Sequence, residues 1–342
     1  MSTNVWLRRI GATLLSTTAT VGAFSLPAEA ASTGVAYVRW LESSHPVDLV
    51  FTAGSGKRNS VVITRSGSTV TIDDRVTLRA GVGCKQVTGD KTRVRCTIDR
   101  EIRRIDASLG SGNDRITNRT SLSLRASGGS GNDYLIGGSG SDSLWGWSGA
   151  DRIWGNGGND FLLGKSGNDV ISGGAGPDNI DGGTGNDREY GGSGNDGHQQ
   201  GRESSGADAD LIDGGTGRDF VSYGPRTRPV SVDSDSGRKD DGRKGEGDTV
   251  RGIEMIIGGH GDDRLSGTKG PDRLYGLGGD DILNGHWHND VLIGGPGADE
   301  LLGEGGYDTL NGEQDGMVDY LDGGDHDDVC VQNADVEVLH DC

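Results

Sequence analysis

Residues 128–199 read GGSGNDYLI, GGSGSDSLW, GWSGADRIW, GNGGNDFLL, GKSGNDVIS, GGAGPDNID, GGTGNDREY and GGSGNDGHQ, which are eight unbroken nonapeptides. Six more occupy residues 258–311, which read GGHGDDRLS, GTKGPDRLY, GLGGDDILN, GHWHNDVLI, GGPGADELL and GEGGYDTLN. Isolated copies surround Asp114, Asp219 and Asp328. A fixed period of this kind predicts a repeat architecture in which each unit packs against its neighbours.

Each nonapeptide combines a flexible half with a short strand-forming half. Glycine at the first, second and fourth positions permits positive φ, which a tight turn with inward carbonyl groups requires. The aspartate at the sixth position adds carboxylate oxygens beside those carbonyls, and calcium prefers such hard oxygen ligands. The eighth position is apolar and should point inward, whereas the seventh and ninth positions should face solvent. In the first array the inward residues are Leu135, Leu144, Ile153, Leu162, Ile171 and Ile180.

These repeats resemble the RTX, or haemolysin-type calcium-binding, family, whose motif is G-G-x-G-x-D-x-U-x with U apolar. The resemblance covers residues 109–331. It implies an all-β fold, a right-handed parallel β-roll (a β-solenoid) in which two nonapeptides make one turn and several Ca²⁺ ions lie between neighbouring turns. By motif position, it implies that the calcium ligands are Asp133, Asp142, Asp151, Asp160, Asp169, Asp178, Asp187, Asp263, Asp272, Asp281, Asp290, Asp299 and Asp308. Weaker candidates are Asp114, Asp196, Asp219 and Asp328; a site needs flanking turns, so terminal repeats should bind poorly.

Departures from the motif predict where the arrays weaken. Glu189 and His198 occupy the inward eighth position, where a buried unpaired charge is costly, so we expect the roll to fray after Ile180. His288 replaces a turn glycine, which puts the site at Asp290 in doubt. A transition-metal or pH-sensing pair of His286 and His288 is the alternative to simple decay of the repeat.

The rest of the chain divides around the two arrays. Arg8 and Arg9, an apolar stretch to Leu26 and Ala28-Glu29-Ala30 predict a signal peptide with cleavage after Ala30. General secretion is favoured over twin-arginine export, because a calcium-dependent fold should not form before export. The predicted parts are a signal peptide (1–30), a small β-rich N-terminal domain (31–108), a first array (109–199), a degenerate repeat and spacer (200–257), a second array (258–331) and a C-terminal tail (332–342).

The four cysteines predict disulfides, because an exported protein meets an oxidising environment. Cys84 and Cys96 flank Gly89-Asp90, a turn signal, so their thiols can meet across a hairpin. Cys330 and Cys342 form the second expected pair, which closes the C-terminal tail. Free thiols or zinc ligands are the alternatives, but neither pair has zinc-site spacing.

Composition limits both the core and the partners. The chain has 64 glycines, 31% apolar residues and a formal net charge of −19. So few apolar side chains cannot build a large ordinary core, and the self-repulsion favours divalent cations bound within the fold. The charge argues against nucleic acid and anionic membranes as partners, and no apolar run is long enough for a membrane span. We therefore expect a secreted, extracellular protein.

No catalytic signature accompanies the repeats, since the sequence contains neither H-E-x-x-H nor G-x-S-x-G. We therefore expect no enzyme, and interpret the chain as a secreted calcium-ion-binding protein that folds on binding extracellular calcium. The alternative is a calcium-stabilised adhesin or cell-surface matrix protein that contacts a glycan or other cell-surface partner. A hydrolase with a cryptic carboxylate pair in residues 32–108 or 200–257 is the third interpretation. The outward aromatic residues that bear on the adhesin are Tyr134, Trp145, Trp154 and Tyr275.

Overall fold

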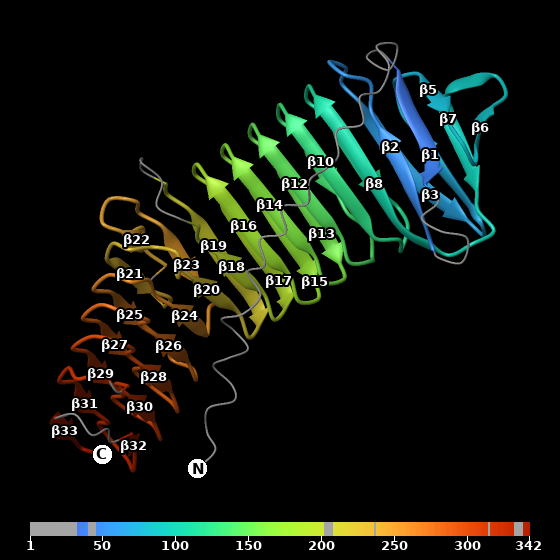
Figure 1. The fold of residues 1–342 in the computed structure, drawn as a ribbon. Coiled ribbons are helices and arrows are strands. Elements are labelled where there is room, and N and C mark those ends of the chain that lie inside the picture. The colour runs from blue at the N-terminus through green and yellow to red at the C-terminus, as the bar shows by residue number, and fades with distance from the viewer. Residues whose placement is uncertain (1–32, 40–45, 202–207, 236, 314, 332–337) are drawn as a thin grey trace.

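The computed structural model describes residues 33–39, 46–201, 208–235, 237–313, 315–331 and 338–342. The predicted signal peptide and its cleavage site lie outside these residues. The described part is built from strands joined by turns, and contains no helix that could cross a membrane. Figure 1 shows the strands stacked one behind another along most of the chain.

The N-terminal strands pair mainly in antiparallel fashion. Strands β1 and β2, β3 and β4, β4 and β7, and β6 and β7 are antiparallel neighbours. Their alternation of buried and exposed residues follows the polar alternation of the sequence, so one face of each hairpin packs inward. These strands are β1 (Gly34–Arg39), β2 (Val47–Thr52), β3 (Ser60–Ser66), β4 (Thr69–Asp73), β5 (Leu78–Ala80), β6 (Cys84–Val87) and β7 (Asp90–Thr97).

The longest sheet runs from the N-terminal strands through both repeat arrays, and beyond β2 its strands are parallel. Arg125 pairs with Ser143, and Ser143 pairs with Phe161, so one turn of the roll takes 18 residues, or two nonapeptides. The repeat strands of this sheet are β8 (Ile102–Ser111), β10 (Leu124–Ser130), β12 (Ser143–Ser148), β14 (Phe161–Ser166), β16 (Asn179–Thr184), β18 (Gly197–Gln199), β20 (Phe220–Ser222), β24 (Met255–Ile257), β26 (Arg273–Tyr275), β28 (Val291–Ile293), β30 (Thr309–Asn311) and β32 (Val329–Cys330).

Two further sheets cover the opposite side of the roll. One continues from β3, and its repeat strands are β9 (Arg115–Asn118), β11 (Tyr134–Ile136), β13 (Arg152–Gly157), β15 (Val170–Ala175), β17 (Arg188–Gly194), β19 (Leu211–Gly217) and β23 (Thr249–Arg251). The other consists of β21 (Val230–Asp233), β22 (Gly242–Arg243), β25 (Arg264–Ser266), β27 (Ile282–Asn284), β29 (Glu300–Leu302), β31 (Tyr320–Asp322) and β33 (Val338–His340). Parallel strands at a two-repeat period, together with N-terminal antiparallel strands, confirm the all-β fold and the β-roll.

The core of the roll is a column of apolar side chains that forms two clusters. The eighth-position residues from both sides meet inside, and Leu135 and Leu144 are each fully buried in the same cluster. Their neighbours at the seventh and ninth positions are partly or fully exposed, as the strand period requires. The predicted inward positions are therefore confirmed.

The prediction that the roll frays after Ile180 is wrong. Strands β17 and β18 continue both sheets, and the buried side chains of Glu189 and His198 meet across the core with Oε2 and Nδ1 2.7 Å apart. The Gly182 N–H donates to Glu189 Oε1 at 2.8 Å, and Gln200 donates a further bond. The charge is therefore not unpaired, and the pair fills the gap between two apolar clusters that end at Ile180 and resume at Ile212.

Both predicted disulfides are formed. Cys84 and Cys96 face each other on the antiparallel strands β6 and β7, where they tie the N-terminal hairpin. Cys330 joins Cys342, which holds the last residues of the chain against the end of the roll. Among the described residues no cysteine remains free.

Replacing Glu189 with alanine should destabilise the folded protein, because the buried His198 imidazole loses its partner. An unsatisfied buried polar group costs about 1–3 kcal/mol. The double variant Glu189→Leu/His198→Leu replaces both polar groups with apolar ones and should recover most of that loss. Thermal denaturation of the parent, single and double variants in saturating calcium measures the effect. A double variant less stable than Glu189→Ala contradicts the proposed pairing.

Candidate metal centres

The repeat aspartates form hydrogen bonds from one turn of the roll to the next. The N–H of Asp133 donates to Asp151 Oδ1 at 2.7 Å, and the N–H of Asp151 donates to Asp169 Oδ1 at the same distance. We call the rows of aspartates linked in this way the aspartate ladder. Its bonds are 2.7–3.0 Å long, and its rows run from Asp114 to Asp248, from Asp142 to Asp219, from Asp263 to Asp319 and from Asp272 to Asp328.

The second carboxylate oxygen of most ladder aspartates is buried and has no hydrogen-bond partner. Ten predicted ligands share this state: Asp133, Asp151, Asp160, Asp169, Asp178, Asp187, Asp281, Asp290, Asp299 and Asp308. The weaker candidates Asp114, Asp196, Asp219 and Asp328 share it too. Removal from water disfavours the charged form, so burial raises the pKa of Asp151 to about 7 and that of Asp281 to about 8. Neighbouring ladder carboxylates raise the pKa of both further.

The surroundings of these bare oxygens suit calcium. A Cβ atom placed on Gly146 would lie 2.2 Å from Asp151 Oδ2 and 2.8 Å from the carbonyl oxygen of Gly164. A carboxylate and a turn carbonyl therefore converge above the first glycine of the repeat, which explains why this position has no side chain. Hard oxygen donors of both kinds are the ligand set of calcium, and a buried charge without a partner is otherwise costly. The residues present fit the ion that the repeat implies.

Three predicted ligands differ from the others, because a backbone N–H of the same repeat already binds their second oxygen. The donor and acceptor pairs are Gly138 and Asp142 at 2.6 Å, Gly259 and Asp263 at 2.5 Å, and Thr268 and Asp272 at 2.5 Å. The structure thus brings all thirteen predicted residues into the ladder but divides them into two chemical states. Asp290, whose turn lacks two glycines, belongs with the bare carboxylates.

Sequence reasoning missed several members of the ladder. Asp210, Asp248 and Asp319 accept the N–H groups of Asp187, Asp210 and Asp299 at 2.8, 2.9 and 3.0 Å. Glu254 takes the same place for the N–H of Asp219, at 2.8 Å. These residues lack the glycine half of the motif but keep its second half. The retained pattern, an acidic residue two places before an apolar one and four before a glycine, was the available signal.

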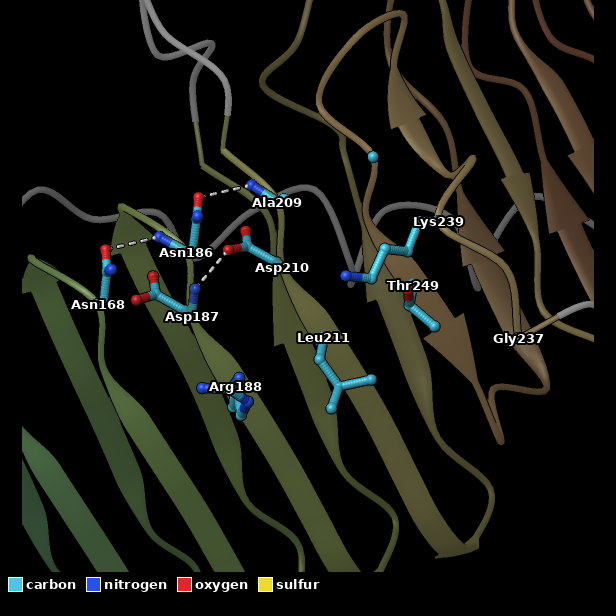
Figure 2. A pocket seen from close by; sticks show the side chains of 11 residues that line it. Asn168, Asn186, Asp187, Arg188, Ala209, Asp210, Leu211, Gly237, Lys239 and Thr249 are labelled. Atoms are coloured by element: carbon cyan, nitrogen blue, oxygen red, sulfur yellow. Dashed lines mark hydrogen bonds between the residues drawn. The ribbon is translucent and has the colours of Figure 1, made fainter.

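A pocket of about 490 Å³ opens where the ladder passes through the spacer. Figure 2 shows Asp187 and Asp210 linked on one side of it, with Lys239 and Thr249 on the other. Successive ladder residues here are 23 and then 38 positions apart instead of 18. The ladder bonds keep lengths of 2.8 and 2.9 Å here, and residues of the added chain, Gly237 and Lys239, line the pocket beside two candidate ligands.

Of the two histidines considered as a pair, His286 has hydrogen-bond partners outside that pair. His286 lies 2.9 Å from Ser266 Oγ through Nε2 and 3.3 Å from Glu304 through Nδ1. Among the described residues, His286 and His288 share no cluster of metal-binding side chains.

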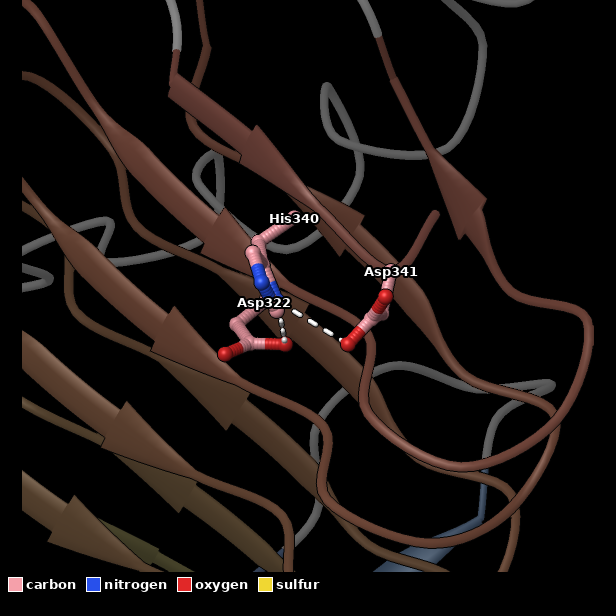
Figure 3. A group of neighbouring side chains, drawn as sticks. All are labelled: Asp322, His340 and Asp341. Atoms are coloured by element: carbon pink, nitrogen blue, oxygen red, sulfur yellow. Dashed lines mark hydrogen bonds and ion pairs between the residues drawn. The ribbon is translucent and has the colours of Figure 1, made fainter.

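A mixed acidic and histidine cluster instead lies near the C-terminus. It consists of Asp322, His340 and Asp341, where both carboxylates approach His340 Nδ1, at 3.3 and 3.0 Å (Figure 3). His340 and Asp341 are exposed, so solvated ion pairs account for this group.

Comparison with known proteins agrees with the repeat geometry. The family profile of the RTX calcium-binding nonapeptide repeat matches residues 127–162, 163–197, 204–224, 257–292 and 285–315. No curated protein matches the chain. Proteins with such repeats typically bind Ca²⁺ and are generally secreted, and two disulfides accord with a location outside the cytoplasm. The chain carries multiple RTX calcium-binding nonapeptide repeats and is a calcium-binding repeat protein.

Proposed function

We propose that this protein is secreted and that its β-roll forms when extracellular calcium binds, without catalytic activity of its own. The observation that carries the proposal is the row of buried aspartate oxygens that lack any hydrogen-bond partner. Asp133, Asp151 and Asp169 are each at most 1% exposed, yet each leaves one oxygen bare. A bound cation supplies the missing partner and neutralises the charge.

Electrostatic repulsion supports coupled binding and folding. Ladder carboxylates lie on successive turns, and strands of one sheet are about 4.8 Å apart. Like charges at that spacing in a poorly hydrated interior oppose the closed roll. Where calcium is scarce the chain should therefore stay open during export, and calcium outside the cell should then drive folding by mass action. The two disulfides and the predicted signal peptide support an exported protein.

Removal of calcium should abolish most of the β-sheet signal in far-ultraviolet circular dichroism. Titration with calcium should restore it, with a midpoint of about 10⁻⁴–10⁻³ M, the range of extracellular modules. Magnesium at equal concentration is the control and should fail, because it demands shorter bonds and keeps its water ligands. Unchanged β content after removal of calcium would argue strongly against this function.

The stabilisation conferred by calcium should be smaller at pH 5 than at pH 8. The pKa of Asp281 is raised to about 8 in the metal-free roll, from an ordinary value of 3.8, mainly by burial. The metal-free roll thus holds protons that the unfolded chain releases above about pH 4, so its stability is greatest at low pH and is lost as the pH rises toward 8. The difference in far-ultraviolet β-sheet signal between dialysed and calcium-loaded protein measures the effect at each pH. A larger difference at pH 5 contradicts the assignment.

A second candidate function is adhesion, and an exposed aromatic group on the longest sheet favours it. Trp147 and Phe161 are 53% and 41% exposed, and the Phe161 ring lies 6.3 Å from that of Trp145. The guanidinium group of Arg125 lies 5.3 Å from the Trp145 ring. Flat aromatic faces beside a cation suit contact with a sugar or another cell-surface partner.

If this aromatic group binds cell walls or glycans, Trp145→Ala/Phe161→Ala should lose calcium-dependent retention on them. The parent should be retained in calcium and released by chelation. Tyr275→Ala, which removes an outward aromatic residue of the second array, is the matched control and should be retained. Equal retention of the double variant and the parent contradicts the adhesion function, and circular dichroism checks that each variant is folded.

A further inference from the structure

The repeat turns occur in two backbone conformations. In most of them the residue at the second position has a φ in the left-handed region, even where it is not glycine. Trp147, Asn156 and Lys165 have φ angles of 80°, 72° and 84°. Such a conformation costs free energy for residues with a Cβ atom, so it persists only where its surroundings impose it. The aspartates of these three turns, Asp151, Asp160 and Asp169, all have a bare second oxygen.

Three turns lack this left-handed residue. They span residues 137–142, 258–263 and 267–272, and in each the second-position N–H binds the second oxygen of the repeat's own aspartate. In the fourteen complete nonapeptides the two properties change together: a left-handed second position accompanies a bare carboxylate, and its absence accompanies a satisfied one. The turn therefore has one form suited to an ion and another closed by the chain itself.

The place of these turns in the fold is also distinctive, because each stacks on a segment that is not a complete repeat. Ser139 N–H bonds to Thr120 O, and His260 N–H bonds to Arg226 O. The third turn follows the shortened segment at Glu254, whose carbonyl accepts the Arg273 N–H. None of the three has a complete repeat turn before it on its side of the roll.

We propose that Asp142, Asp263 and Asp272 bind no calcium, and that their turns are calcium-independent starting points for the stacks that follow. An N–H group presents its positive end to the oxygen that a cation would need, so the two compete for the same carboxylate. The calcium ligands are the aspartates with bare oxygens, and they include Asp248 in the spacer. This inference rests on the proposed calcium-binding function and assigns which turns perform it.

Adjacent ladder residues offer a matched pair of variants for the test. Asp142 and Asp160 are linked by a 2.7 Å bond in one row, but only Asp160 has a bare oxygen. Asp160→Asn should bind fewer calcium ions per chain than the parent, whereas Asp142→Asn should bind the same number. Asp142→Asn should instead lower the Tm of the calcium-loaded protein, because its amide cannot accept both backbone bonds. Native mass spectrometry and calcium titration of the full-length protein measure the stoichiometry.

A second pair of variants keeps the test decisive if a variant of the first pair fails to fold. Asp272 and Asp290 are likewise adjacent and differ in the same way, so Asp290→Asn should lose calcium and Asp272→Asn should not. Equal loss of calcium by both members of a foldable pair overturns the inference while leaving the proposed function intact. A parent protein that binds no calcium overturns the proposed function itself.

Amide hydrogen exchange tests the role of these turns as starting points independently of calcium stoichiometry. In calcium-free protein, the Gly138, Gly259 and Thr268 amides should be better protected than the Trp147 and Asn156 amides, because their bonds need no ion. Addition of calcium should slow exchange across the neighbouring turns while changing these three amides least. Uniform lack of protection at all five amides without calcium contradicts the role of these turns as starting points.

Discussion

The structure depends on how most of its repeat aspartates are bonded: one carboxylate oxygen accepts a backbone hydrogen bond and the other oxygen has no partner. The bonded oxygen links its turn to the turn before, as Asp151 does with Asp133, and so sets the spacing of the roll. The bare oxygen carries buried charge that the protein does not neutralise with a side chain. The contact that aligns the turns therefore also makes their stacking unfavourable without a cation, which ties structure and ion together.

The apolar core is too thin to override that constraint. Each nonapeptide contributes one inward apolar side chain, and full burial of such a residue is worth about 1.5–3 kcal/mol. The backbone of all nine residues must be ordered around that one side chain, so hydrophobic burial alone does not close the roll. The core even accommodates Glu189 and His198 in place of two apolar residues, because Glu189 Oε2 pairs with His198 Nδ1 and Gly182 and Gln200 donate to Glu189 Oε1. Continuity of the strands matters more here than continuity of the apolar column.

Much of this arrangement follows from the period of the sequence, and the exceptions have physical causes. The inward residues and both disulfides were predictable because each depends on local spacing, and the β-roll was implied by the resemblance of the repeats to the RTX family. The pairing of Glu189 with His198 was missed although they are nine residues apart, the separation that brings two inward positions to face each other. Asp210 and Asp248 were missed because their glycine half-repeat is lost. The satisfied state of Asp142 depends on turn conformation, which the motif letters do not encode: its repeat, GGSGSD, has the same glycines as GGSGND at residues 128–133, where Asp133 has a bare oxygen.

The spacer shows which half of the repeat the fold needs. Between Asp187 and Asp248 the chain adds residues twice, yet the ladder bonds on either side keep lengths of 2.8 and 2.9 Å. Lengthening a loop is inexpensive, since doubling it adds only about 0.6 kcal/mol of closure entropy. What must be retained is the carboxylate that bonds the previous turn and the apolar residue two places later, such as Val250 after Asp248. The strand half of the repeat thus maintains the register of the roll. The glycine half can vary where inserted chain, as in the spacer, replaces the tight turn.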